Sequence, residues 1–210
     1  MILILLFYRS FGKIASRKDD LMPITKVTRD DIISRLMDVF RTVGYDGATL
    51  SKLSKATGLQ RASLYHRFPG GKKEMAQAVL AQAEAWLDAH VLTPLAGPGT
   101  PPARLENMAQ ALDAFYMHGG ASCLLDALSL GEGGEQFRDH IQTAFARWID
   151  ALAALVVAQT GCPAAEAQLR AEDAVLSIQG ALVLARGTGK TEPFQRVLKN
   201  LPTLLFSPRR

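Results

Sequence analysis

The chain has 210 residues, 48% of them apolar and 21% charged, so it can bury a core and is not a disordered polypeptide. Two cysteines, Cys123 and Cys162, exclude a disulfide framework and a four-cysteine metal site, and they indicate a reducing compartment. The net charge of +4 is uneven, because residues 23–80 carry ten basic and five acidic side chains. This segment is therefore the candidate for binding a polyanion.

The first residues, Met1–Tyr8, are apolar but too few to cross a bilayer, and they lack the basic lead-in and cleavage site of a secretion signal. A polar run at 17–20 separates them from Met22, after which the patterned sequence begins. We therefore expect residues 1–22 to be an unstructured extension, with translation starting at Met1 or Met22. A short membrane-touching tail is the alternative to a cytoplasmic protein without stable membrane association.

The first predicted helix begins near Arg29, where Thr28 is a suitable N-cap and Asp30 and Asp31 suit the positive end of the helix dipole. Its apolar residues recur at steps of three and four, and Gly44 is expected to end it. These apolar residues are Ile32, Ile33, Leu36, Val39, Phe40 and Val43.

Two shorter helices are predicted next. Thr49 caps the first of them, Gly58 closes it, and Leu59 to Phe68 forms the second. Two short helices joined by a glycine turn are typical of a helix-turn-helix, whose second helix enters the major groove of DNA. The predicted DNA-binding domain spans residues 23–80.

A long helix from Lys73 to about His90 should connect this domain to residues 81–210, with Thr93 to Pro102 as a loop between them. Further helices are expected at about 103–118, 121–130, 134–160, 165–187 and 191–206, and no segment alternates with period two. The predicted fold is all-α: a three-helix DNA-binding domain joined by a long helix to a C-terminal helical domain.

Residues 32–80 resemble the DNA-binding domain of the TetR/AcrR family of transcriptional regulators. The resemblance lies in the stretch from Thr49 to Leu59 and in Ser63-Leu64-Tyr65-His66-Arg67-Phe68. The longer spacer in Phe68-Pro69-Gly70-Gly71-Lys72 is similar to the LmrA/YxaF branch, as is Cys123-Leu124-Leu125. The resemblance implies a homodimer that binds double-stranded operator DNA and a C-terminal domain that binds a small, largely apolar effector.

The candidate DNA-binding residues cluster around the third helix. Gln60, Arg61 and Ser63 are expected to contact base edges, since glutamine can pair with adenine and arginine with guanine. Family positions that contact phosphates match Tyr65, His66 and Lys72, and Thr49 could contact a phosphate from the start of the second helix. An ordinary solvated helix surface is the alternative.

The C-terminal domain is expected to hold both the effector and the dimer interface. Its candidate effector-binding residues are Phe115, Tyr116, Met117, Phe145 and Trp148, and Phe137 adds to the aromatic supply; a solid core is the alternative. The last two long helices carry more apolar residues than one neighbour needs, among them Ile178 and Leu182. Gly180, Ala181 and Ala185 could allow two copies to approach closely.

No catalytic, cofactor or metal site is predicted. Gly187-Thr188-Gly189-Lys190-Thr191 looks like the end of a phosphate-binding loop, but the required earlier glycine is replaced by Leu184 and a helix precedes it. The four histidines are far apart and lack metal-ligand spacing. The sequence thus predicts a ligand-released repressor with a palindromic operator. The alternatives are an effector-independent DNA-binding protein and an enzyme of unknown chemistry.

Overall fold

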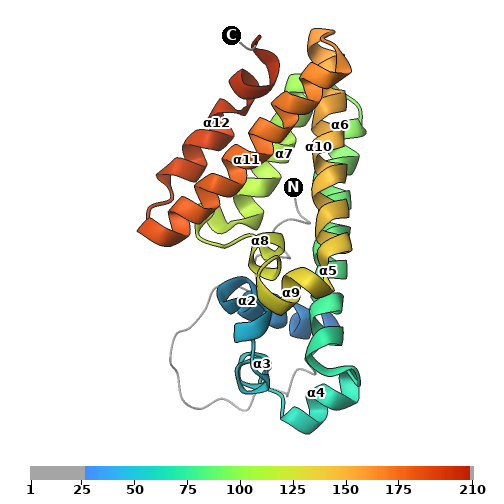
Figure 1. Cartoon of the computed structure of the whole chain (residues 1–210), viewed down its shortest axis with the longest axis vertical. Coiled ribbons are helices and arrows are strands. Elements are labelled where there is room, and N and C mark those ends of the chain that lie inside the picture. Colours follow the sequence, from blue (N-terminus) through green and yellow to red (C-terminus); the bar gives the residue numbers. More distant parts are fainter. Residues whose placement is uncertain (1–26, 209–210) are drawn as a thin grey trace, which may run out of the picture.

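A computed structural model describes residues 27–208, and every regular element within that range is a helix (Figure 1). The expected extension at 1–22 lies outside the described residues. In chain order the elements are α2 (Arg29–Gly47), α3 (Leu50–Thr57), α4 (Arg61–Arg67), α5 (Gly71–Leu87), the π-turn η1 (Asp88–Leu92), α6 (Thr93–Ala96), α7 (Pro101–Phe115), the 3₁₀ turn η2 (Met117–Gly119), α8 (Leu124–Leu128), α9 (Gly131–Gln136), α10 (Arg138–Thr160), α11 (Ala164–Thr188) and α12 (Glu192–Phe206). The all-α prediction is confirmed.

The start of α2 follows its sequence signal. The Thr28 hydroxyl accepts from the Asp31 amide at 3.1 Å, and the Asp31 carboxylate accepts from the Thr28 amide at 3.1 Å, which completes a capping box. Hydrogen bonds from Thr28 lower the pKa of the Asp31 carboxyl group. Gly44 kinks α2 with φ 68° instead of ending it, so the last turn runs to Gly47.

The N-terminal core joins helices from both halves of the sequence. Phe40, Leu53 and Leu64 are fully buried in it, and they fix α2, α3 and α4 against one another. The same core includes Leu124, Leu128, Phe137 and Ile141 from α8 and the start of α10. Phe137, which we grouped with the effector-domain aromatics, instead packs edge-on against Tyr45 at 5.3 Å between ring centroids.

A second core fills the C-terminal half, where α7, α10, α11 and α12 pack side by side (Figure 1). Among the described residues only α10 is long and apolar enough to cross a membrane, with a mean hydropathy of 1.4 in its most apolar window. A core helix passes the same test, and α10 buries Trp148, Leu152 and Val156 against its neighbours. Its hydropathy is therefore accounted for by packing inside the bundle.

The prediction of a loop from Thr93 to Pro102 is wrong for residues 93–96, which are helical. The π-turn η1 and α6 continue from α5 and bury Val91 and Leu95, and only residues 97–100 connect α6 to α7. Pro94 directly follows the π-turn η1 and stands at the second position of α6. The two halves are thus joined by packed helix and not by an open linker.

Candidate nucleic-acid interface and buried cavity

The turn between α3 and α4 is fixed by local hydrogen bonds. Gly58 adopts the left-handed conformation (φ 72°), and its amide donates to the Ser54 carbonyl, as expected at a helix C-terminus. The Thr57 hydroxyl donates to the Leu53 carbonyl at 2.8 Å, and the Arg35 guanidinium donates to the Thr57 carbonyl at 3.1 Å. Sequence reasoning missed this Arg35 contact, which ties α2 directly to the turn.

α4 lies at the opposite end of the molecule from the C-terminus (Figure 1). Its polar side chains are exposed to solvent. Leu64 alone on α4 is buried, so one face holds the helix in place and the rest is available. Five predicted contact residues are exposed together here: Gln60, Arg61, Ser63, Tyr65 and His66. Gln60 is the N-cap of α4, so the helix starts two residues later than expected.

The charges on this face are available to a ligand. Within residues 27–208, Arg61 and Arg67 form no ion pair, and α4 contains no acidic residue that would repel an anion. Unpaired cations on a preformed helix suit a polyanion, because binding releases the counterions of the polyanion. Thr49 is also exposed, and its hydroxyl caps α3 by accepting from the Lys52 amide at 3.3 Å.

Lys72 differs from the other predicted phosphate contacts. It is half-buried at the start of α5, where its ammonium donates to the Tyr45 carbonyl at 3.2 Å and lies 4.0 Å from the centre of the Tyr45 ring. These contacts hold α5 against the end of α2. A phosphate contact by Lys72 would have to be made in addition to them, or in their place.

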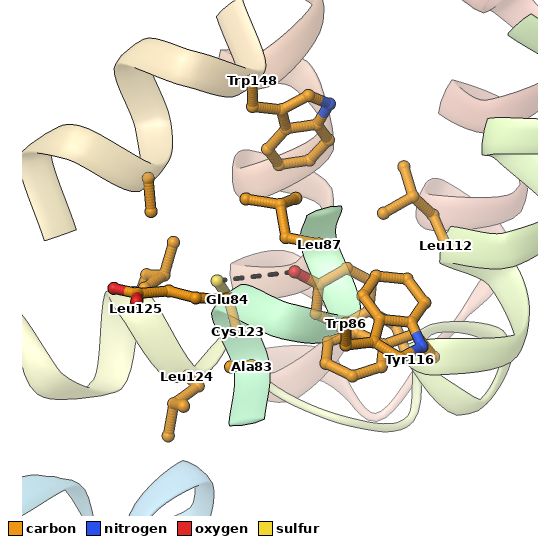
Figure 2. A pocket seen from close by; sticks show the side chains of 12 residues that line it. Ala83, Glu84, Trp86, Leu87, Leu112, Tyr116, Cys123, Leu124, Leu125 and Trp148 are labelled. Atoms are coloured by element: carbon orange, nitrogen blue, oxygen red, sulfur yellow. Dashed lines mark hydrogen bonds between the residues drawn. The ribbon is translucent and has the colours of Figure 1, made fainter. Parts of the chain in front are cut away.

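A cavity of about 40 Å³ lies where the C-terminal helices meet the N-terminal core (Figure 2). Its walls come from α5, α7, the start of α8 and α10. The lining residues are Ala83, Glu84, Trp86, Leu87, Leu112, Phe115, Tyr116, Cys123, Leu124, Leu125, Ala144 and Trp148. Both tryptophans of the chain are among them, so the cavity is lined mainly by aromatic and aliphatic surface.

Few polar groups reach this cavity. The Tyr116 hydroxyl donates to the Cys123 sulfur at 3.5 Å (Figure 2), and burial raises the pKa of this phenol well above its ordinary value, so it stays protonated. The buried indole N–H of Trp148 has no hydrogen-bond partner among the described residues. Glu84 is the one acidic residue in the lining, and its carboxylate lies 3.2 Å from Nδ1 of His140.

The structure brings together three of the five predicted effector-binding residues. Phe115, Tyr116 and Trp148 line the cavity, whereas Phe145 is half-buried between the two cores and does not. Met117 is also outside the cavity, because it sits in a left-handed turn (φ 51°) and is 49% exposed. Sequence reasoning missed Trp86 and Cys123 as lining residues. Nothing in their local sequence indicates that they meet α10 at one cavity.

The predicted dimer surface is wrong for the residues that we expected to carry it. Ile178, Ala181, Leu182 and Ala185 are all buried inside the same chain. The opposite face of α11 is exposed and apolar, and we call it the α11 stripe: Leu169, Leu176, Gly180, Val183 and Leu184. The sequence showed too many apolar residues for one neighbour, but it did not show which face the chain itself covers.

A helix-turn-helix with exposed cations, joined by packed helices to a helical domain with an aromatic-lined cavity, is the architecture of a two-domain helical DNA-binding regulator. Residues 32–79 match the family model of bacterial regulatory proteins of the tetR family, and residues 102–200 match that of the LmrA/YxaF-like transcriptional regulator C-terminal domain. The chain belongs to the TetR family of transcriptional regulators, in its LmrA-like branch, as the resemblance implied.

Individual relatives agree with this family. The transcriptional regulator LmrA of Bacillus subtilis is 22% identical over 187 residues, which cover 85% of this chain and 96% of LmrA. IcaR of Staphylococcus aureus, a negative regulator of a biofilm operon, is 37% identical over 51 residues, or 24% of this chain and 27% of IcaR. The crystal structure of a TetR regulator from Legionella pneumophila shares the fold, with a TM-score of 0.72, 17% identity, and coverage of 87% of this chain and all of that one.

Proposed function

We propose that this regulator is a dimeric, cytoplasmic repressor that leaves a palindromic operator when a small, largely apolar molecule enters the C-terminal cavity. The observation that carries the proposal is the pairing of an exposed, cationic α4 with an aromatic-lined cavity in one packed chain. Repression is supported by IcaR, which is named as a negative regulator and matches this chain over 51 residues.

In the proposed complex, α4 enters the major groove and its first residues read the bases. Gln60 and Arg61 are exposed at the N-terminal end of α4, where recognition helices meet base edges, and Ser63 follows them. Thr49, Tyr65, His66 and Lys72 would bind phosphates and set the register of the protein on the duplex. Base contacts then specify the operator and phosphate contacts strengthen binding to any duplex.

The proposed dimer forms through the last two long helices, with the α11 stripe at its centre. Leu176 is 68% exposed and Leu184 is 55% exposed, and a Cβ atom added at Gly180 would meet nothing within 4 Å. A second copy could therefore approach the α11 backbone closely and cover these leucines. Exposed positions on α12 are mainly polar, among them Arg196, Lys199 and Asn200, so α12 would lie at the rim.

The effector proposal follows from the cavity walls. The Trp148 indole N–H is free to donate one hydrogen bond, whereas the Tyr116 hydroxyl already donates to Cys123, so a largely apolar molecule with one acceptor atom fits this lining. The cavity of about 40 Å³ is smaller than the roughly 150 Å³ apolar cavity that admits benzene. Entry of an effector would therefore have to move the walls, and this movement is what could reach the DNA-binding helices.

The direct test is selection of bound duplexes from random DNA, followed by fluorescence anisotropy with the selected and a scrambled duplex. We expect an inverted repeat and tighter binding to the selected duplex than to the scrambled one by a factor of roughly 10³ or more. Equal affinity for both duplexes would contradict the proposal. A thermal-shift screen of small molecules then separates ligand-released repression from occupancy alone, since a ligand that binds only the native state raises the melting temperature.

Sedimentation tests the dimer. Leu176→Glu and Leu184→Glu should yield folded monomers, because each places a charge in the proposed interface and none in the chain's own core. Leu130→Glu is the matched control, since Leu130 is 65% exposed and lies outside the last two long helices, and it should remain a dimer. Dimers of unchanged strength in both α11 variants would refute this interface.

A further inference from the structure

The helix α4 has few means of its own to hold its position. It has seven residues, its N-cap Gln60 makes no side-chain capping bond, and Leu64 is its one buried residue. A helix this short is marginal by itself in water, because the first turn fixes several backbone angles for a single hydrogen bond. The direction in which α4 presents Gln60 and Arg61 must therefore be set by the segment that precedes it.

The Ser54 hydroxyl reaches the start of α4. Ser54 is half-buried on α3, and its hydroxyl donates to the Leu59 carbonyl at 2.5 Å. This carbonyl belongs to the planar peptide group that joins Leu59 to Gln60, so the hydrogen bond restricts the orientation in which the chain enters α4. The Thr57 hydroxyl supports the same turn, since it accepts from the Leu59 amide at 3.4 Å.

Arg35 holds this turn from α2. Its guanidinium donates to the Thr57 carbonyl at 3.1 Å, two residues before Leu59 in the chain. α3 packs against both α2 and α4, so the bonds of Ser54 and Arg35 connect the three helices at one turn. Two side chains from the neighbouring helices therefore determine where the chain leaves α3 and enters α4.

We propose that Ser54 and Arg35 are positioning residues for base readout, an inference that rests on the proposed function. Their hydrogen bonds hold the α3–α4 turn so that Gln60 and Arg61 meet base edges in the correct direction. Hydrogen bonds to bases depend on direction, whereas attraction to phosphates depends mainly on charge. Loss of either positioning bond should therefore weaken binding to the operator and leave binding to other duplexes nearly unchanged.

The test is a double-mutant cycle, measured by anisotropy with the duplex selected from random DNA and a scrambled duplex. Ser54→Ala should lower affinity for the selected duplex about three- to tenfold and affinity for the scrambled duplex less than about twofold. Its melting temperature should change little, because alanine is a better helix former than serine. Ser34→Ala, at a half-buried serine of α2, is the matched control and should leave both affinities unchanged.

The cycle separates positioning from an independent contribution to binding. If Ser54 acts only through the base contacts, it has nothing to act through once Gln60 and Arg61 are both replaced by alanine. In that background Ser54→Ala should lower operator affinity by less than about twofold. An equal fold-loss in both backgrounds would overturn the inference, as would undiminished operator affinity of the single variant.

Arg35→Met is the second variant, and it decides the question if Ser54→Ala does not fold. It should give the same selective loss without changing the slope of log affinity against log salt, because a positioning residue neutralises no phosphate. Arg104→Met is its matched control, since Arg104 donates to the Leu95 carbonyl at 2.9 Å in the C-terminal half, and it should keep the operator-to-scrambled ratio. Equal loss on both duplexes with a slope reduced by roughly one unit would make Arg35 a phosphate contact and overturn its positioning role.

The unmodified protein separates these outcomes from failure of the proposed function. If it binds the selected duplex specifically while the Ser54 and Arg35 variants keep its operator-to-scrambled ratio, the inference alone is overturned. If it binds no duplex specifically, the proposed function and the inference are overturned together.

Discussion

The α4 surface and the C-terminal cavity are built in opposite ways. Residues on α4 that we assign to DNA follow one another within a short stretch, and one buried residue, Leu64, anchors their helix. The cavity is assembled from α5, α7, α8 and α10, and its walls are part of the core. Changes on α4 should therefore alter binding without altering stability, whereas changes in the cavity should alter stability first.

The largest expected effect is at a cavity wall. Leu112 is 1% exposed and lines the cavity, so Leu112→Ala should lower the free energy of unfolding by about 2–5 kcal/mol, through lost burial and an enlarged void. Urea denaturation measures the loss. Arg61→Ala is the comparison, and it should change the same quantity by less than about 0.5 kcal/mol. A loss below about 1 kcal/mol for Leu112→Ala would mean that this wall is loosely packed.

The second-largest expected effect is on DNA affinity and not on stability. Replacing Gln60 or Arg61 by Ala should weaken binding to the selected operator by about 1–3 kcal/mol and change binding to a scrambled duplex much less. The reason is that a base contact is made only on the matching sequence. Arg196→Ala, an exposed change on α12, is the control and should leave both affinities as they are. An equal loss of affinity for both duplexes would show that these two residues bind phosphates and do not read bases.

Lys72 combines features of the exposed α4 surface and of the packed core, because it is half-buried and donates to the Tyr45 carbonyl. As a phosphate contact, Lys72→Ala should weaken both duplexes equally and reduce the slope of log affinity against log salt by roughly one unit. Lys199→Ala on α12 should leave the slope unchanged. An unchanged slope together with a lower melting temperature in Lys72→Ala would identify Lys72 as a clamp between α5 and α2.

The smallest effect concerns the capping box of α2. Thr28→Ala should cost about 1 kcal/mol of stability, measured by urea denaturation at neutral pH. Because hydrogen bonds from Thr28 lower the pKa of the Asp31 carboxyl below its ordinary value, this stabilisation is present above the ordinary carboxyl pKa and is lost as the pH falls through the folded-state value. The difference between Thr28→Ala and the unmodified protein should therefore narrow under acid conditions. A constant difference at all pH values would show that Asp31 does not contribute.

The sequence alone determined the elements whose signals are local. Thr28 and Thr49 cap their helices and Gly58 closes α3 as predicted, because these groups satisfy backbone atoms only a few residues away. The position of α4 was predictable for the same reason, since one apolar anchor and a run of polar residues fit within two helical turns. The family resemblance also rests on this segment.

Only the tertiary structure decided which apolar surfaces meet. α11 is apolar on two faces, and periodicity alone did not show that Ile178 faces the chain's own core while Leu176 faces solvent. Phe137 packs against Tyr45, which is far away in sequence. Met117 points outward because its backbone is left-handed, a conformation that a methionine in the sequence does not indicate. The hydrophobic effect favours burial of apolar surface but is not directional, so it does not specify which residues meet. The contacts that form the cavity are therefore determined by the packing of helices that are distant in sequence.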